Sequence, residues 1–69
     1  MEDLPELQLS GIDGNAFAIM GSVQKAMKAY AKHDKDYDAV IKFKEYQNDA
    51  MSGDYNHLLQ TTMKYCDVY

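Results

Sequence analysis

The apolar positions of this 69-residue chain recur mainly at the three- and four-residue spacing of amphipathic helices. The first such segment covers residues 14–32, where apolar side chains share one face and lysines occupy the opposite face. We predict a helix there, with Asp13 or Asn15 accepting hydrogen bonds from its free N-terminal amides. Its expected buried face consists of Ala16, Ile19, Met20, Val23, Ala26, Met27 and Tyr30.

Two further helices are predicted in the second half of the chain. One runs from Asp36 to Met51, and the other follows after one or two residues, with Ser52 or Asp54 as its N-cap. The expected buried face of the second helix is Ala39, Val40, Phe43, Tyr46, Ala50 and Met51. That of the third helix is Tyr55, Leu58, Leu59, Thr62, Tyr65 and Cys66.

In the N-terminal segment the apolar side chains recur with a different period. Residues 4–9 alternate apolar and polar side chains, which is typical of a short strand, and Pro5 restricts that strand to a sheet edge. Residues 66–69 could form a second short strand beside it. The chain is therefore expected to form one mainly α domain over residues 1–69, a compact three-helix fold with a short N-terminal edge strand.

Composition narrows the classes of partner and compartment. The net charge of −4 argues against general nucleic-acid binding, because each phosphate contact needs a cation and the seven lysines are dispersed. The longest apolar run is too short to span a bilayer, so no membrane association is expected. Cys66 is the only cysteine, which excludes an intramolecular disulfide and favours a reducing cytoplasm.

Residues 34–45, with the sequence DKDYDAVIKFKE, have nearly the spacing of a helix-loop-helix calcium loop. The carboxylates at its first, third, fifth and twelfth positions are Asp34, Asp36, Asp38 and Glu45. The sixth position normally requires glycine, but here it is Ala39, and no other stretch supplies the second loop of a pair. An acidic helix start explains the same residues without a missing glycine. We therefore expect no metal site, and calcium binding is only a minor alternative.

No catalytic constellation is recognisable in the sequence. On a common helix His57 and Cys66 would point about 180° apart, so they cannot pair as base and nucleophile. We expect a protein that is not an enzyme and that carries no cofactor.

Four residues are candidates for partner binding. Phe17, Tyr37 and Ile41 fall outside the expected buried faces, and Gly21 lies in a helix interior, where glycine costs about 1 kcal/mol relative to alanine. Contact with a foreign protein or a second copy would explain all four. The other interpretation is that the segment from Leu4 to Ile12 covers these groups within the monomer.

Two glycine-containing turns precede predicted helices and could hold a nucleotide or another anion on free amides. Their residues are Asp13, Gly14, Asn15, Ser52, Gly53 and Asp54. Each turn has its own aspartate, which would occupy the amides and repel an anion, so helix capping is the favoured role.

Two stretches, DGNAFAIMG at residues 13–21 and SGDYNHLLQTTMKYCDV at residues 52–68, resemble a family of short uncharacterised proteins of tailed bacteriophages and prophages. The resemblance spans most of the chain, although the segment around residues 34–45 departs from the family pattern. It implies an accessory protein made in the bacterial cytoplasm, within a group that often binds and inhibits host factors, including defence systems. We therefore expect a non-catalytic protein that binds and antagonises or redirects a host protein. An oligomeric ligand-binding protein is the alternative.

Overall fold

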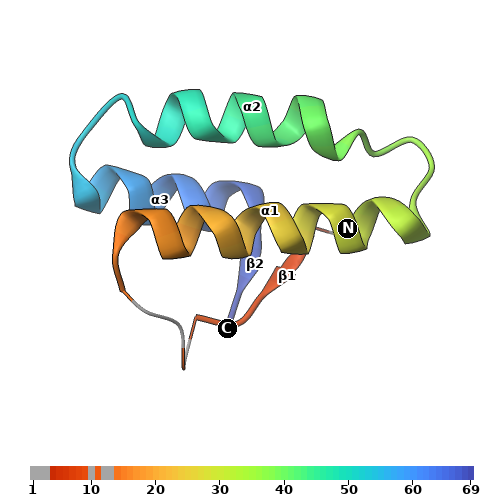
Figure 1. Ribbon diagram of the computed structural model, residues 1–69, viewed down its shortest axis with the longest axis horizontal. Coiled ribbons are helices and arrows are strands. Elements are labelled where there is room, and N and C mark those ends of the chain that lie inside the picture. Colours follow the sequence, from red (N-terminus) through yellow and green to blue (C-terminus); the bar gives the residue numbers. More distant parts are fainter. Residues whose placement is uncertain (1–3, 10, 12–13) are drawn as a thin grey trace.

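Three helices and two short strands form the chain in the computed structural model, which describes residues 4–9, 11 and 14–69. In chain order they are β1 (Glu6–Leu7), α1 (Ala16–His33), α2 (Ala39–Ala50), α3 (Tyr55–Tyr65) and β2 (Asp67–Val68). The predicted mainly α, three-helix fold is confirmed (Figure 1).

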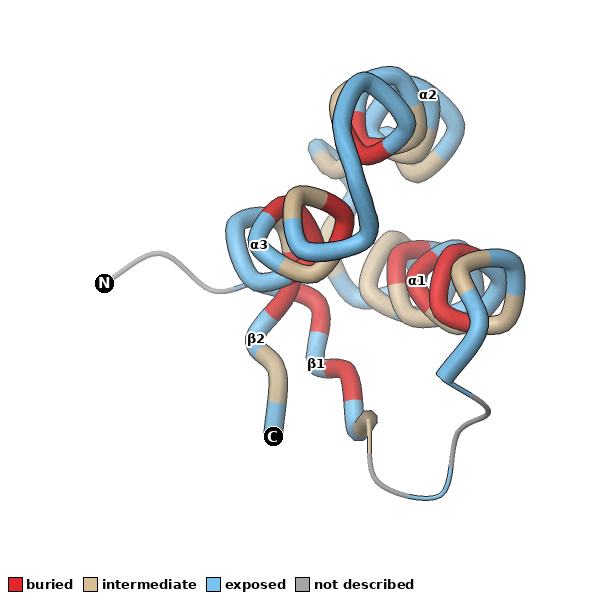
Figure 2. Tube along the Cα trace, turned by 90° about the vertical axis from the view of Figure 1, so that its left-hand side faces the viewer, coloured by how far each residue is buried: buried red, intermediate tan, exposed pale blue. Residues whose placement is uncertain are grey.

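The elements are arranged in three layers. α1 and α3 lie side by side and run in the same direction, and α2 packs antiparallel across both of them (Figure 1). The two strands lie on the side of the α1–α3 pair that faces away from α2 (Figure 2). β1 contacts α1 and β2 contacts α3, so the sheet lies across these two helices.

β1 and β2 pair as parallel strands, an arrangement that the sequence analysis left open. Glu6 is aligned with Asp67 and Leu7 with Val68. The Asp67 amide donates to the Pro5 carbonyl at 2.8 Å, so the ladder begins at a proline that contributes only its acceptor.

Side-chain caps define the starts of α1 and α3. The Asn15 side chain accepts from the Ala18 amide at 2.8 Å, and the Asp54 carboxylate accepts from the His57 amide at 2.9 Å. These bonds satisfy amides that have no partner within the helix. Asp13, the other candidate cap of the first helix, lies outside the described residues.

The predicted start of α2 at Asp36 is wrong. The Asp38 carboxylate accepts from the amides of Val40 at 3.0 Å and Ile41 at 3.2 Å, and the helix begins after it. The Asp36 amide instead bonds to the Asp34 carboxylate at 3.0 Å within a turn. Capping by Asp38 therefore makes the helix begin later in the chain, at Ala39, than the apolar spacing indicated.

Tyr46 is the largest fully buried side chain, and its hydroxyl lies 2.8 Å from Thr62 Oγ1. Thr62 donates its only hydroxyl proton to the Leu58 carbonyl at 2.8 Å, so Tyr46 must be the donor to Thr62. The surrounding core consists of Leu7, Ile19, Met20, Val23, Met27, Ala50, Leu58 and Cys66. This chain of two hydrogen bonds joins α2 to α3 inside an otherwise apolar core.

The expected buried face of α1 is confirmed, but three positions elsewhere are wrong. Val40, Met51 and Tyr55 are exposed. α2 packs against α1 and α3 with one side only, so its buried stripe is narrow. The stripe consists of Ala39, Phe43, Tyr46 and Ala50. The α2–α3 link has four residues, 51–54, rather than one or two. Met51 is its first residue, and Tyr55 follows it as the first residue of α3.

The hydrogen bond between Tyr46 and Thr62 makes a testable contribution to stability. Thr62→Val removes the acceptor and leaves a buried phenol unpaired, so we expect a loss of about 1–3 kcal/mol in the free energy of unfolding. Tyr46→Phe is expected to cost about 1 kcal/mol. The double variant should lose less than the sum of the two, as measured by urea denaturation. Strict additivity would show that the two hydroxyls are not coupled.

Candidate functional site

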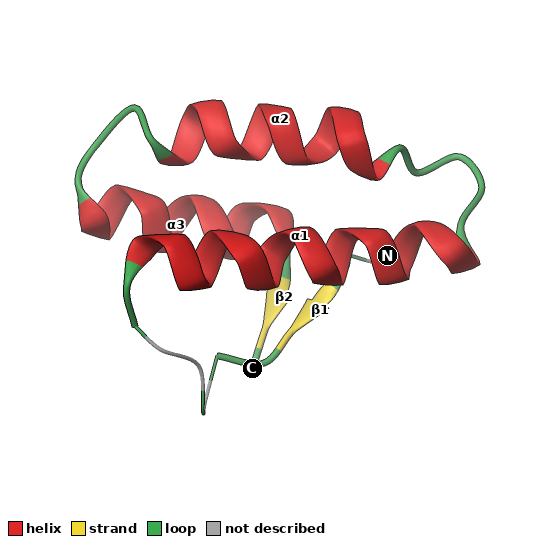
Figure 3. Ribbon diagram, viewed as in Figure 1, coloured by secondary structure: helices red, strands yellow, loops and turns green. Residues whose placement is uncertain are grey.

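Three exposed apolar side chains gather at one end of the bundle. Phe17 is 79% exposed, Met51 60% and Tyr55 46%, and all three line one shallow pocket of about 270 Å³. Figure 3 shows the α2–α3 link at the same end as the start of α1. The buried side chains Met20, Ala50 and Leu58 also line the pocket. We call Phe17, Met51 and Tyr55 the Phe17 surface.

A hydrogen bond fixes the relative position of two parts of this surface. The Tyr55 hydroxyl donates to the Gly14 carbonyl, which connects the start of α3 to the start of α1 across 41 positions of sequence. Tyr55 is thereby held at one edge of the pocket while its ring stays partly exposed. Sequence reasoning missed Met51 and Tyr55 as surface residues because their spacing fitted buried faces. The signal available was their position at helix ends, on either side of Gly53.

The four partner-binding candidates do not form one surface. Phe17 lies near the start of α1 and Ile41, 55% exposed, near the start of α2. Because these helices are antiparallel, the two starts lie at opposite ends of the bundle (Figure 1). Gly21 is exposed and has open space where a side chain would be. Residues 4–9 pack against α1 and the core and leave Phe17 and Ile41 exposed.

The prediction that Tyr37 points away from the core is wrong. Tyr37 lies in the link between α1 and α2 and packs, partly buried, against the core. Its ring centroid is 4.8 Å from that of Tyr30, in an edge-on arrangement at 72°. Burial raises the pKa of the Tyr37 phenol, with Cys66 and Tyr30 as smaller contributors. A helical wheel misplaced this residue because the helix starts two positions after it.

The structure brings the two candidate anion-binding turns together but occupies them with their own side chains. Asn15 and Asp54 cap their helices, and the Gly14 carbonyl accepts from Tyr55. The Ser52 hydroxyl donates to the Asp49 carbonyl at 2.6 Å. The Asp54 carboxylate also disfavours an anion at the start of α3. Capping is therefore the role that this geometry supports.

Ser52, His57 and Asp49 form a cluster that sequence reasoning missed. His57 Nε2 lies 2.8 Å from the Asp49 carbonyl, 3.1 Å from Asp49 Oδ1 and 3.3 Å from Ser52 Oγ. A serine–histidine–carboxylate relay needs the carboxylate on one ring nitrogen and the serine on the other. Here all contacts converge on one nitrogen, and the serine proton is committed to the Asp49 carbonyl. The cluster therefore clamps the α2–α3 link and does not activate a nucleophile.

The calcium-like stretch has a capping geometry. The Asp34 and Asp38 carboxylates bond to backbone amides of the turn and of α2, and Glu45 lies exposed within α2. Across residues 4–9, 11 and 14–69, which include all four carboxylates, no three acidic, histidine or cysteine side chains are grouped to hold a metal ion.

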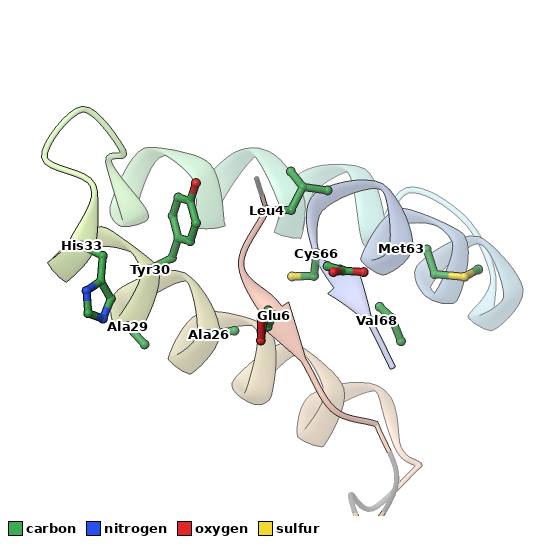
Figure 4. Close-up of a pocket in the computed structure, with 10 residues that line it drawn as sticks. Leu4, Glu6, Ala26, Ala29, Tyr30, His33, Met63, Cys66 and Val68 are labelled. Carbon is green, nitrogen blue, oxygen red and sulfur yellow. The ribbon is translucent and has the colours of Figure 1, made fainter. Parts of the chain in front are cut away.

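A larger open groove of about 1070 Å³ lies between the C-terminal half of α1 and the end of α3 (Figure 4). Leu4, which precedes β1, and Glu6 of β1 line it, and β2 contributes Asp67 and Val68. Cys66 also lines it but is almost fully buried, and burial raises the pKa of its thiol from 9.0 to about 11. The thiol is thus protonated at neutral pH, which is unsuitable for a thiolate nucleophile.

Comparisons of the chain with protein-family models, with curated proteins and with solved structures gave no match. In the described part of the chain, no helix combines the length and the apolar character that a membrane crossing requires.

Two glycine substitutions should have opposite effects on stability. At Gly53 an added Cβ would lie 2.8 Å from His57 Cβ, so we expect Gly53→Ala to lower the free energy of unfolding by about 1–3 kcal/mol. Gly21→Ala meets open space and should raise it by about 1 kcal/mol. Thermal and urea unfolding of both variants measure the difference. Equal effects would contradict the close Gly53–His57 contact.

Stability should decline at alkaline pH because of the buried thiol. The raised pKa means that the folded protein keeps the Cys66 proton while the unfolded chain loses it above pH 9. This contribution is therefore complete below pH 9 and is lost as the pH rises to about 11. Burial of Tyr37 and Tyr46 acts in the same direction at higher pH. Thermal midpoints across this range should fall less steeply for Cys66→Ala, and superimposable pH profiles would contradict the assignment.

Proposed function

We propose that this protein is a non-catalytic binding protein whose Phe17 surface contacts a partner protein. The observation that carries the proposal is the convergence of Phe17, Met51 and Tyr55 on one pocket lined with buried core residues. Aromatic and methionine side chains are enriched at protein interfaces, and contiguous exposed apolar patches are uncommon on monomers without a binding role. A single apolar side chain of the partner, inserted between Phe17 and Tyr55, would fit a pocket of this size.

The kind of partner follows from the resemblance to phage proteins. The two stretches that carry it, residues 13–21 and 52–68, contain Phe17 and Tyr55, and Met51 directly precedes the second. We propose a phage-encoded accessory protein of the bacterial cytoplasm that binds and antagonises or redirects a host protein, such as a defence factor. The coincidence of the Phe17 surface with the phage-like stretches supports this origin.

The alternatives have less support from the geometry. The helix starts that could hold a nucleotide or another anion are occupied by Asn15 and Asp54. A catalytic role lacks an activated group, because Cys66 is buried and protonated and His57 contacts its neighbours through one nitrogen. A second copy of the chain is the remaining occupant that the Phe17 surface could accept. Native mass spectra distinguish such a dimer from a complex with a host protein.

The test compares two exposed apolar residues at opposite ends of the bundle. Wild-type protein, Phe17→Ser and Ile41→Ser are immobilised and exposed to bacterial lysate, and retained proteins are identified by mass spectrometry. We expect wild type and Ile41→Ser to retain the same host protein, and Phe17→Ser to lose it. Both substitutions are at exposed positions, so each should change the free energy of unfolding by only about 0.5 kcal/mol.

Four outcomes would contradict the proposal. Equal retention by Phe17→Ser would remove the Phe17 surface from the interaction, and equal loss by Ile41→Ser would place the contact elsewhere. Native mass spectra of the purified protein provide the other two. A dimer that Phe17→Ser abolishes would identify a second copy as the occupant, and a co-purified nucleotide would favour the ligand-binding alternative.

A further inference from the structure

The two-stranded sheet has a backbone edge with no strand beside it. The Asp67 and Tyr69 amides donate to the Pro5 and Leu7 carbonyls at 2.8 and 3.0 Å, so these residues turn their polar groups toward the neighbouring strand. Because successive residues of a strand alternate, the N–H and C=O of Val68 point away from β1. Within the described residues the sheet contains β1 and β2 alone, so this side of β2 is unpaired.

Two like charges lie next to each other on the exposed face of the sheet. Glu6 and Asp67 are paired in register, so their side chains project from the same face, and both are exposed. Adjacent like charges in a cross-strand pair destabilise a sheet. Among the described residues, no lysine or histidine forms an ion pair with either carboxylate. The pair therefore carries an uncompensated negative charge.

These carboxylates border the groove of about 1070 Å³ between α1 and α3. Met63 of α3, 57% exposed, lines the same groove, and Figure 4 shows it with Val68 beyond β2, on the side away from β1. No lysine lies among the groove residues. The unpaired edge of β2 is thus flanked by carboxylates on one face and by an exposed apolar side chain of α3.

We infer that the edge of β2 on the Met63 side of this groove docks an extended basic segment of a partner protein, which adds to β2 as a third strand. Backbone groups of the segment bond to Val68, and its side chains alternate between the two faces. A lysine or arginine beside Asp67 compensates the Glu6–Asp67 pair through charge-assisted hydrogen bonds. The next side chain, on the other face, is apolar and packs against Met63.

Charge complementarity favours a basic segment over a second copy of this chain. Pairing of two β2 edges would place the Glu6–Asp67 pairs of both copies in one sheet and so bring two further carboxylates near the first pair. The whole chain also carries a net charge of −4, which disfavours self-association. An extended cationic segment meets neither obstacle and removes the repulsion between the two carboxylates.

This inference does not depend on the proposed function. The groove and the pocket of the Phe17 surface share no lining residue. Phe17→Ser should therefore leave the binding of a basic segment unchanged. A failure to bind the basic segment would likewise leave the capture of a host protein by the Phe17 surface unaffected.

The test uses the full chain and a short synthetic peptide that alternates lysine with valine. We expect saturable binding that weakens as salt is added, and much weaker binding of the matched peptide in which glutamate replaces lysine. Asp67→Asn should weaken binding of the lysine peptide about tenfold, as expected for the loss of one charge-assisted contact. Glu45→Gln removes an exposed carboxylate of α2 outside the groove and should leave the affinity unchanged.

Hydrogen exchange distinguishes strand addition from a diffuse charge attraction. Binding of the lysine peptide should slow exchange of the Val68 amide, because that N–H gains a backbone acceptor. Unchanged exchange at Val68, or equal weakening by Asp67→Asn and Glu45→Gln, would overturn the inference. Absence of peptide binding together with self-association of Asp67→Asn would show that the carboxylates only block pairing between copies, and would overturn it as well.

Discussion

The structure depends on one buried phenol. Tyr46 places a polar hydroxyl at the centre of a core that is otherwise almost entirely apolar. Leaving that hydroxyl unpaired would destabilise the fold by more than its hydrogen bond stabilises it. Thr62 resolves this because its own proton is already committed to the Leu58 carbonyl, which leaves its oxygen as an acceptor. Only one position of α2 along α3 satisfies both groups. In so small a chain this specificity matters, since a slip of one turn would separate the two hydroxyls and take one end of the buried stripe of α2 off the core.

The position of α2 in turn determines what lies at the end of the bundle. Ala50 is its last buried residue, so the chain leaves the helix at a fixed point and Met51 emerges beside the start of α1. The contacts of His57 with Asp49 then hold the link closed, and Gly53 is close enough to His57 to exclude a larger residue. The Phe17 surface is therefore a product of core packing.

The sequence predicted elements better than it predicted contacts between them. α1 was predicted well because its apolar stripe is long and uninterrupted and asparagine marks its start. The same periodicity wrongly predicted that Val40 is buried. The spacing of apolar residues gives the direction of the buried face of a helix but not its width. That width depends on how the helix packs against its neighbours. Tyr37 was misplaced because an aspartate cap excluded it from the helix. The Tyr55–Gly14 bond joins residues 41 positions apart, which no local pattern can indicate. Such contacts define the Phe17 surface, and of its three residues the sequence predicted only Phe17 to be exposed.

The pairing of β1 with β2 also determines how the fold responds to mechanical force. The strands are parallel, and the segments through which tension would enter precede β1 and follow β2. Pulling on them slides one strand along the other, so the bonds from Asp67 to Pro5 and from Tyr69 to Leu7 are loaded together and not broken one after another. An antiparallel pair of chain ends would be unzipped instead. Although the strands are short, their hydrogen bonds are loaded in shear and resist extension of the helical bundle.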